Sequence, residues 1–108
     1  MPKNVIPAQI KLQLETIIQN FNQQTFTDHQ RYYLTRYKGA YLYLDRYEHG
    51  RVIQICRLKY IGSLTNWDFA IFKYSSETYD TNEWFFPGSN LIDGTIEGAM
   101  KAGLHAYP

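Results

Sequence analysis

A change in the spacing of apolar residues, at about residue 30, constrains this chain more than any other feature. Over residues 8–24, apolar side chains recur every three or four positions, which is the period of an α-helix with one face to bury. Pro7 stands just before this segment, and proline is tolerated where a helix begins. Over residues 31–74 the period becomes two and β-forming residues dominate, which indicates strands. The change predicts an α+β fold built on an antiparallel sheet.

Strands are expected at about 31–37, 40–47, 52–60 and 67–74. The segment Glu48-His49-Gly50-Arg51 predicts a hairpin turn with His49 and Gly50 at its tip, because both residues tolerate a positive φ. Counting outward from this turn sets the register of the two strands that it joins. On one side of the sheet the expected pairs are Tyr47 with Val52, Tyr43 with Cys56 and Tyr41 with Leu58; on the other they are Leu44 with Ile55 and Leu42 with Arg57.

The last third of the sequence predicts one more short strand and a second helix. Trp84-Phe85-Phe86 is a candidate strand, ended by Pro87-Gly88. Asp93 or Thr95 is suited to cap a helix at about 95–105, which would present apolar residues at a spacing of four. The expected order is an N-terminal amphipathic helix, four or five antiparallel strands and a C-terminal helix, in a single domain over residues 1–108.

The alternation leaves both faces of this sheet largely apolar. In the strand at 67–74, Trp67, Phe69 and Ile71 belong to one face, and Ala70, Phe72 and Tyr74 belong to the other. A sheet with one wet face would instead alternate apolar and polar residues. One amphipathic helix covers only one face. The second face is therefore expected to be covered by the C-terminal segment, by a second copy of the chain or by a ligand.

Charge is unevenly distributed along the chain, although the formal total is only +1. Residues 31–73 hold eight Lys or Arg against three Asp or Glu, which gives +5, and residues 74–108 hold one Lys against five Asp or Glu, which gives −4. The two segments are expected to neutralise each other within one fold or across a dimer. The alternative is that the basic middle attracts an anionic partner.

The sequence lacks the residue patterns that several kinds of catalytic, metal and phosphate sites require. His29, His49 and His105 are scattered, with no spacing typical of a metal site. Cys56 lies in the middle of a predicted strand, where a free cysteine usually behaves as a small buried apolar residue. No serine stands in a nucleophile-elbow pattern, no glycine-rich phosphate loop is present and no carboxylates are paired for acid–base work. We therefore expect no catalytic residue, no metal and no cofactor.

Cysteine content and the first residues bear on location. A single cysteine permits no intrachain disulfide, which mildly favours a reducing compartment. The sequence begins Met-Pro-Lys-Asn and shows no apolar run of the length of a signal peptide or a membrane span. A cytoplasmic protein without membrane contact is expected.

Aromatic and basic residues alternate through the middle of the chain. Ten Tyr, six Phe and two Trp make 17% of the sequence aromatic. Sheets that bind single-stranded nucleic acid stack bases on such rings beside cations. The opposing interpretation is ordinary cross-strand packing with cation–π contacts, which the weak net charge and the apolar sheet favour. If this stretch binds a nucleic acid or another ligand, the candidate residues are Tyr41, Tyr43, Arg46, Arg57, Lys59 and Tyr60.

Three segments resemble a family of small uncharacterised bacterial proteins, a domain of unknown function. These are Cys56-Arg57-Leu58-Lys59-Tyr60, the run from Trp67 to Ser75, and the run from Asp93 to Ala99. The resemblance covers roughly residues 31–108 and implies a stand-alone bacterial domain. It implies no activity and transfers no site residue.

Three functions follow in order of preference. The first is a non-enzymatic interaction domain that forms a homodimer, through the second apolar sheet face or by pairing the basic middle with the acidic tail. The second is a single-stranded nucleic-acid-binding module that uses the aromatic and basic side of the sheet. The third is a small pocket for an anionic ligand, lined by Tyr, Trp and a few Arg.

Overall fold

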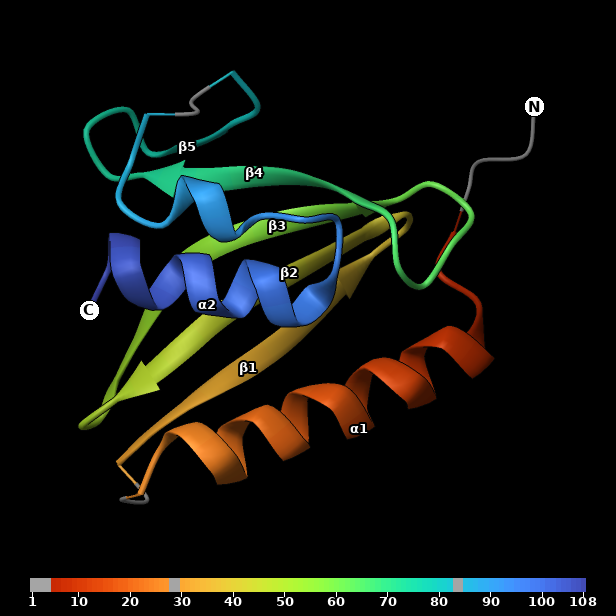
Figure 1. The fold of residues 1–108 in the computed structure, drawn as a ribbon, viewed down its shortest axis with the longest axis horizontal. Coiled ribbons are helices and arrows are strands. Elements are labelled where there is room, and N and C mark those ends of the chain that lie inside the picture. The colour runs from red at the N-terminus through yellow and green to blue at the C-terminus, as the bar shows by residue number, and fades with distance from the viewer. Residues whose placement is uncertain (1–4, 28–29, 83–84) are drawn as a thin grey trace.

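The computed structural model describes residues 5–27, 30–82 and 85–108. It consists of a five-stranded antiparallel sheet and two α-helices that pack on it (Figure 1). This confirms the α+β architecture that the sequence predicts. The elements, in chain order, are α1 (Ala8–Thr25), β1 (Arg31–Lys38), β2 (Tyr41–Glu48), β3 (Arg51–Tyr60), β4 (Trp67–Lys73), β5 (Thr78–Asp80), the 3₁₀-helix η1 (Ser89–Leu91) and α2 (Ile96–Ala106).

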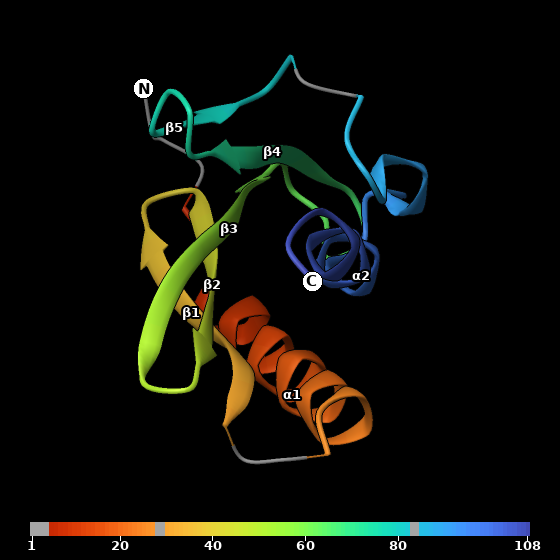
Figure 2. The same ribbon diagram turned by 90° about the vertical axis from the view of Figure 1, so that its left-hand side faces the viewer.

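The strands pair in chain order, β1-β2-β3-β4-β5, and both helices lie on the same face of the sheet (Figure 2). The Tyr33 hydroxyl on β1 donates to the backbone oxygen of Met100 on α2, and the Thr35 hydroxyl donates to the Glu15 carboxylate on α1. Because Tyr33 and Thr35 share a face, α1 and α2 must cover that one face together. Of the three covers expected for the second face, the C-terminal segment does not supply one through α2, because this helix packs on the same face as α1. We call the covered side the helix face.

Local chemistry sets where α2 begins. The Thr95 hydroxyl accepts a hydrogen bond of 3.0 Å from the backbone N–H of Gly98, so Thr95 is the N-cap of the two candidates, Asp93 and Thr95, that the sequence offers. The Asp93 carboxylate in turn accepts from the N–H and the hydroxyl of Thr95. These bonds lower the pKa of Asp93 below its ordinary value.

A β-bulge changes the predicted register between β2 and β3. The pairs next to the turn are as expected, including Tyr47 with Val52, and His49 and Gly50 at its tip both have positive φ. The register then shifts between Leu44 and Asp45, and Ile55 is the extra residue on β3. Beyond the bulge the expected partners are wrong. The observed pairs are Leu44 with Cys56, Tyr43 with Arg57, Leu42 with Leu58 and Tyr41 with Lys59.

The bulge has a packing reason. Ile55 and Cys56 are adjacent in sequence, yet both are fully buried in the core beneath the helices. A regular strand would turn one of these two side chains toward the other face. The extra residue lets both join the core and shifts Arg57 and Lys59 to the face that the helices leave uncovered.

The fifth strand is not where the sequence predicts it. Strand β5 is Thr78–Asp80, and it follows a turn in which Glu77 has a positive φ of 52°. Phe85 and Phe86 lie outside any strand, and Trp84 lies outside the described residues. The Phe86 ring instead stacks on Phe69 at 6.0 Å between centroids, on the helix face.

Candidate functional site

The face of the sheet away from the helices is rich in tyrosine, and we call it the tyrosine face. No helix of the described residues packs on it (Figure 2). The strand registers place on it Tyr32, Leu34, Arg36 and Lys38 from β1, Tyr41, Tyr43, Asp45 and Tyr47 from β2, Val52, Gln54, Arg57 and Lys59 from β3, Asp68, Ala70 and Phe72 from β4, and Tyr79 from β5.

Two rows of this face alternate cation, tyrosine and cation across three strands. Lys38 pairs with Tyr41, which pairs with Lys59. In the next row Arg36 pairs with Tyr43, which pairs with Arg57. The bulge creates both rows, because the unshifted register would pair these tyrosines with Leu58 and Cys56.

The cations of these rows lie over tyrosine rings. The Arg57 guanidinium carbon is 4.5 Å from the centroid of Tyr41 and 5.3 Å from that of Tyr79. The Arg36 guanidinium carbon is 4.7 Å from the centroid of Tyr43. Such stacked contacts hold the guanidinium planes along the sheet surface. The outer layer of the site therefore consists of guanidinium groups placed over tyrosine rings.

The sheet curls toward the tyrosine face. In a flat sheet β1 and β5 would be about 19 Å apart, because four strand spacings of ~4.8 Å separate them. Nevertheless Arg36 Nη2 on β1 lies 3.3 Å from Tyr79 Oη on β5, and the rings of Tyr43 and Tyr79 are 5.3 Å apart. Asp45 is only 4% exposed at the centre of this face. The curl thus buries part of a face that no helix covers.

The cations of the tyrosine face differ in whether a carboxylate forms an ion pair with them. Asp45 accepts two hydrogen bonds from Arg36, at 2.6 Å from Nε and 3.1 Å from Nη2, so this pair is neutral overall. For Lys38, Arg57 and Lys59 the described residues provide no carboxylate within ion-pair distance. Lys59 nevertheless lies directly across from Asp68 of β4 on the same face, so Lys38 and Arg57 are the two cations with no facing carboxylate among these residues.

The acidic tail does little to neutralise the basic middle. Lys73 and Asp80, with 3.7 Å between Nζ and Oδ2, form the one ion pair between these segments in the described part of the chain. The other ion pairs found there join residues within the basic middle itself. Neutralisation inside one fold, as expected from the charge pattern, is thus limited to this contact.

The six candidate binding residues are divided between the two faces. Tyr41, Tyr43, Arg57 and Lys59 lie together on the tyrosine face. Arg46 lies on the helix face with its side chain fully buried, where Nε donates to Glu48 Oε2 at 2.5 Å and Nη2 donates to the backbone oxygen of Tyr107.

Tyr60 also lies on the helix face, where its ring packs against Trp67 at 5.3 Å. Sequence reasoning left three members of the site out of the candidates: Arg36, Lys38 and Tyr79. Alternation along β1 could have indicated the two cations. Nothing local could have indicated Tyr79, since its role depends on the curl of the sheet.

Cys56 is a free thiol that is buried on the helix face. Burial raises its pKa well above the ordinary value, so the thiol stays protonated and is a poor nucleophile. This confirms the expectation of a small buried residue. No three His, Cys, Asp or Glu side chains of the described residues lie together as metal ligands would.

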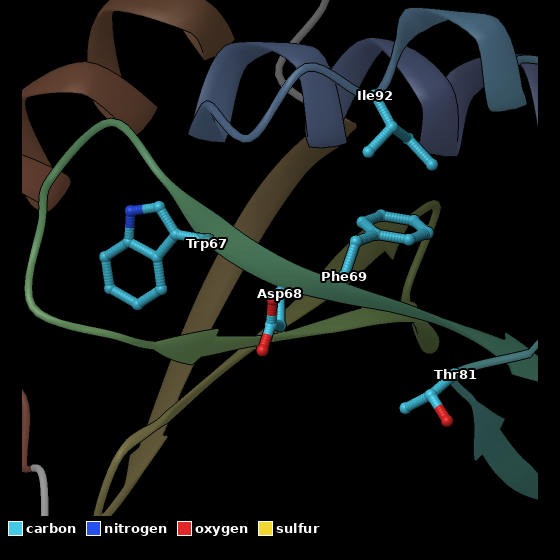
Figure 3. Close-up of a pocket in the computed structure, with 5 residues that line it drawn as sticks. All are labelled: Trp67, Asp68, Phe69, Thr81 and Ile92. Carbon is cyan, nitrogen blue, oxygen red and sulfur yellow. The ribbon is translucent and has the colours of Figure 1, made fainter.

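A pocket of about 220 Å³ lies beside β4, lined by Trp67, Asp68, Phe69, Thr81 and Ile92 (Figure 3). Asp68 is the charged residue of this lining, and a carboxylate repels anions. The pocket therefore does not fit the small anionic ligand that the sequence suggests as a third possibility.

Among the described residues, no helix has the length and apolar character needed to cross a membrane. Comparison of the chain with protein-family models, curated proteins and solved structures found no match.

Proposed function

We propose that the tyrosine face binds single-stranded nucleic acid. The observation that supports this most directly is the pair of rows Lys38–Tyr41–Lys59 and Arg36–Tyr43–Arg57, in which Lys38 and Arg57 face no carboxylate of the described residues, while Arg36 is paired with Asp45 and Lys59 lies opposite Asp68. Sheets that bind single strands combine aromatic rings with nearby positive charges in this way.

The two rows offer distinct contacts to the two parts of a nucleotide. The Tyr41 and Tyr43 rings lie 6.2 Å apart on one strand, each beneath an arginine plane. Bases stack on guanidinium planes as they do on aromatic rings. Lys38 and Lys59 are exposed at the end of the face, where they suit phosphate groups. Recognition of this kind favours single strands over duplexes, whose bases are already stacked.

Fluorescence anisotropy with labelled oligonucleotides of mixed sequence tests the proposal. If Lys38 and Arg57 each neutralise one phosphate, log K should fall against log[salt] with a slope of about −1.4, at about −0.7 per phosphate of a single strand. Arg57→Glu and Lys59→Glu should each weaken binding at least about tenfold. Arg51→Glu is the matched control, because Arg51 is exposed on the helix face and the change in net charge is the same.

Two results would count against nucleic-acid binding. One is the absence of any anisotropy change at about 50 mM salt, where electrostatic binding is strong. The other is an equal loss of affinity in the Arg51→Glu control, which would show a general charge effect and not a site on the tyrosine face.

A second candidate is homodimerisation through the uncharged end of the same face. There the Tyr32 and Tyr47 rings stack at 4.9 Å, and Val52, the cross-strand partner of Tyr47, is 59% exposed. Exposed apolar and aromatic side chains of this kind are typical of interfaces between protein chains. Sedimentation equilibrium of the wild type and of Val52→Glu separates this candidate from the first. A dimer that Val52→Glu dissociates supports it, and a wild-type monomer at micromolar concentration excludes it.

A further inference from the structure

Strand β1 is an end strand of the sheet, and one residue of α1 already bonds its outer edge. The Asn22 carboxamide accepts from the Tyr33 N–H at 2.8 Å and donates from Nδ2 to the Tyr33 carbonyl oxygen at 3.1 Å. A neighbouring strand would make these same two bonds. The Asn22 side chain thus replaces one residue of a missing strand.

The Asn22 contact shows which backbone N–H and C=O groups of β1 point away from β2. Both backbone polar groups of Tyr33 face away from β2, and this direction repeats at every second residue of an antiparallel strand. The backbone N–H and C=O of Thr35 and Tyr37 therefore also point outward. The described residues place no strand against them, and the edge is open between Asn22 at Tyr33 and Ile6, whose N–H donates to the Gly39 carbonyl oxygen at 3.2 Å. An unpaired edge of this kind is a template for an added strand.

A groove runs beside this edge. It has a volume of about 320 Å³ and lies between α1 and β1, with Glu15, Ile18, Gln19 and Asn22 on one side and Tyr33 and Thr35 on the other. Figure 1 shows α1 along the β1 side of the sheet. A strand added to β1 would place alternate side chains over this groove and the remaining ones on the tyrosine face.

Charge distinguishes between the possible occupants of the edge. Of the three cations of strand β1, Arg31 and Arg36 are already paired with Glu48 and Asp45, which leaves Lys38 as the cation to be satisfied. A second β1 from another copy would bring no carboxylate to Lys38, because the strand contains no acidic residue. An acidic segment would instead place a carboxylate beside Lys38, which has no ion-pair partner among the described residues.

We propose that the β1 edge binds an extended, acidic peptide segment as an additional strand, hydrogen-bonded to Thr35 and Tyr37. Main-chain bonds to the edge supply affinity, and side chains at alternate positions supply specificity. Residues that face the groove would be small and uncharged, because Ile18 lines it and the Glu15 carboxylate, which accepts from the Thr35 and Tyr37 hydroxyls, would repel an acidic side chain there. Residues on the tyrosine face would be acidic. Asn22 would compete with the peptide for Tyr33.

The probes for this proposal are the peptide Ac-EVEVEV-NH2 and its basic counterpart Ac-KVKVKV-NH2. Amide hydrogen exchange followed by NMR reports on the edge directly. In the free protein the amides of Thr35 and Tyr37 should exchange faster than that of Tyr33, which Asn22 holds. Saturation with the acidic peptide should slow exchange at Thr35 and Tyr37 by about tenfold or more. The basic peptide should leave it unchanged.

Two variants should move the affinity for the acidic peptide in opposite directions. Thr35→Pro removes an outward N–H without touching the bonds to β2, and proline is tolerated on edge strands, so binding should be lost. Thr35→Ala is its control and should bind like the wild type. Asn22→Ala frees the Tyr33 backbone groups and should strengthen binding severalfold.

Several outcomes would overturn the proposal. These are unchanged exchange at Thr35 and Tyr37 with the acidic peptide, equal protection by the basic peptide, or normal binding by Thr35→Pro. A dimer that Thr35→Pro dissociates would show that the occupant is a second copy. Arg57→Glu should weaken oligonucleotide binding and leave peptide binding intact, so failure at the edge and failure on the tyrosine face are distinguishable.

Discussion

The Tyr33 hydroxyl donates a hydrogen bond of 2.6 Å to the backbone oxygen of Met100, which joins the first strand of the sheet to the last helix. Tyr33 is 2% exposed, so the bond lies in a nearly dry environment. Tyr33→Phe should lower the free energy of unfolding by about 1 kcal/mol, because it removes this bond and leaves the ring packing intact. Urea denaturation measures the change. Tyr32→Phe, on the opposite face, is the control and should stay within about 0.5 kcal/mol of the wild type.

Gly103 permits the close contact between α2 and the sheet. A Cβ at this position would lie 2.6 Å from Ile55 Cγ2 and 2.6 Å from Tyr33 Oη. Gly103→Ala should therefore destabilise the fold by about 1–2 kcal/mol, since overpacking outweighs the ~1 kcal/mol that alanine contributes to a helix. Thermal unfolding reports the loss. Lys101→Ala, at an exposed position of the same helix, should have little effect. A stabilised Gly103→Ala protein would contradict the close packing.

The buried Arg46 guanidinium depends on Glu48. Glu48 Oε2 is 2.5 Å from Arg46 Nε and 3.1 Å from Arg31 Nη2, and Arg46 Nη1 has no partner among the described residues. Glu48→Gln should lower the free energy of unfolding by about 3 kcal/mol, because it leaves a buried charge uncompensated. Chemical denaturation at neutral pH measures this. Glu77→Gln, in an exposed turn, is the control, and an equal effect there would rule out a special role for Glu48.

Stability should fall at alkaline pH. Burial raises the pKa of the Cys56 thiol above its ordinary value of 9.0 and that of the Tyr33 phenol above 10.0. Above these values the unfolded chain loses protons that the folded chain keeps, so the free energy of unfolding falls by up to about 1.4 kcal/mol per pH unit and group. Below about pH 8 neither group contributes to the pH dependence, because both are protonated in the folded and the unfolded chain.

Cys56→Val separates the two groups. It removes the thiol ionisation, so the decline in stability should begin nearer pH 10 than pH 9. Urea denaturation between pH 7 and 11 follows both proteins. The same onset in both would show that Cys56 does not titrate with unfolding.

Helix and strand positions could be predicted from the sequence because they depend on local periodicity. The stripe of α1, the alternation of β1 to β4, the turn at His49-Gly50 and the Thr95 cap were all recognisable in short stretches of residues. The bulge at Ile55 was not, since it satisfies a packing demand from α2 that no local pattern expresses. Because the bulge was not predicted, the expected register placed Arg57 and Lys59 on the wrong face of the sheet.

The sequence by itself determined an aromatic, α+β protein with a basic middle, because composition and period are properties of the chain alone. Only the tertiary structure decided which residues share a face. Both helices pack on one side, so Arg46 is buried and Tyr60 half-buried there, while Tyr41, Tyr43, Arg57 and Lys59 meet on the other. The curl of the sheet then brings Tyr79 to Arg36, across strands that are 43 residues apart in sequence. Such contacts arise from the balance of burial over the whole molecule, which no segment encodes separately.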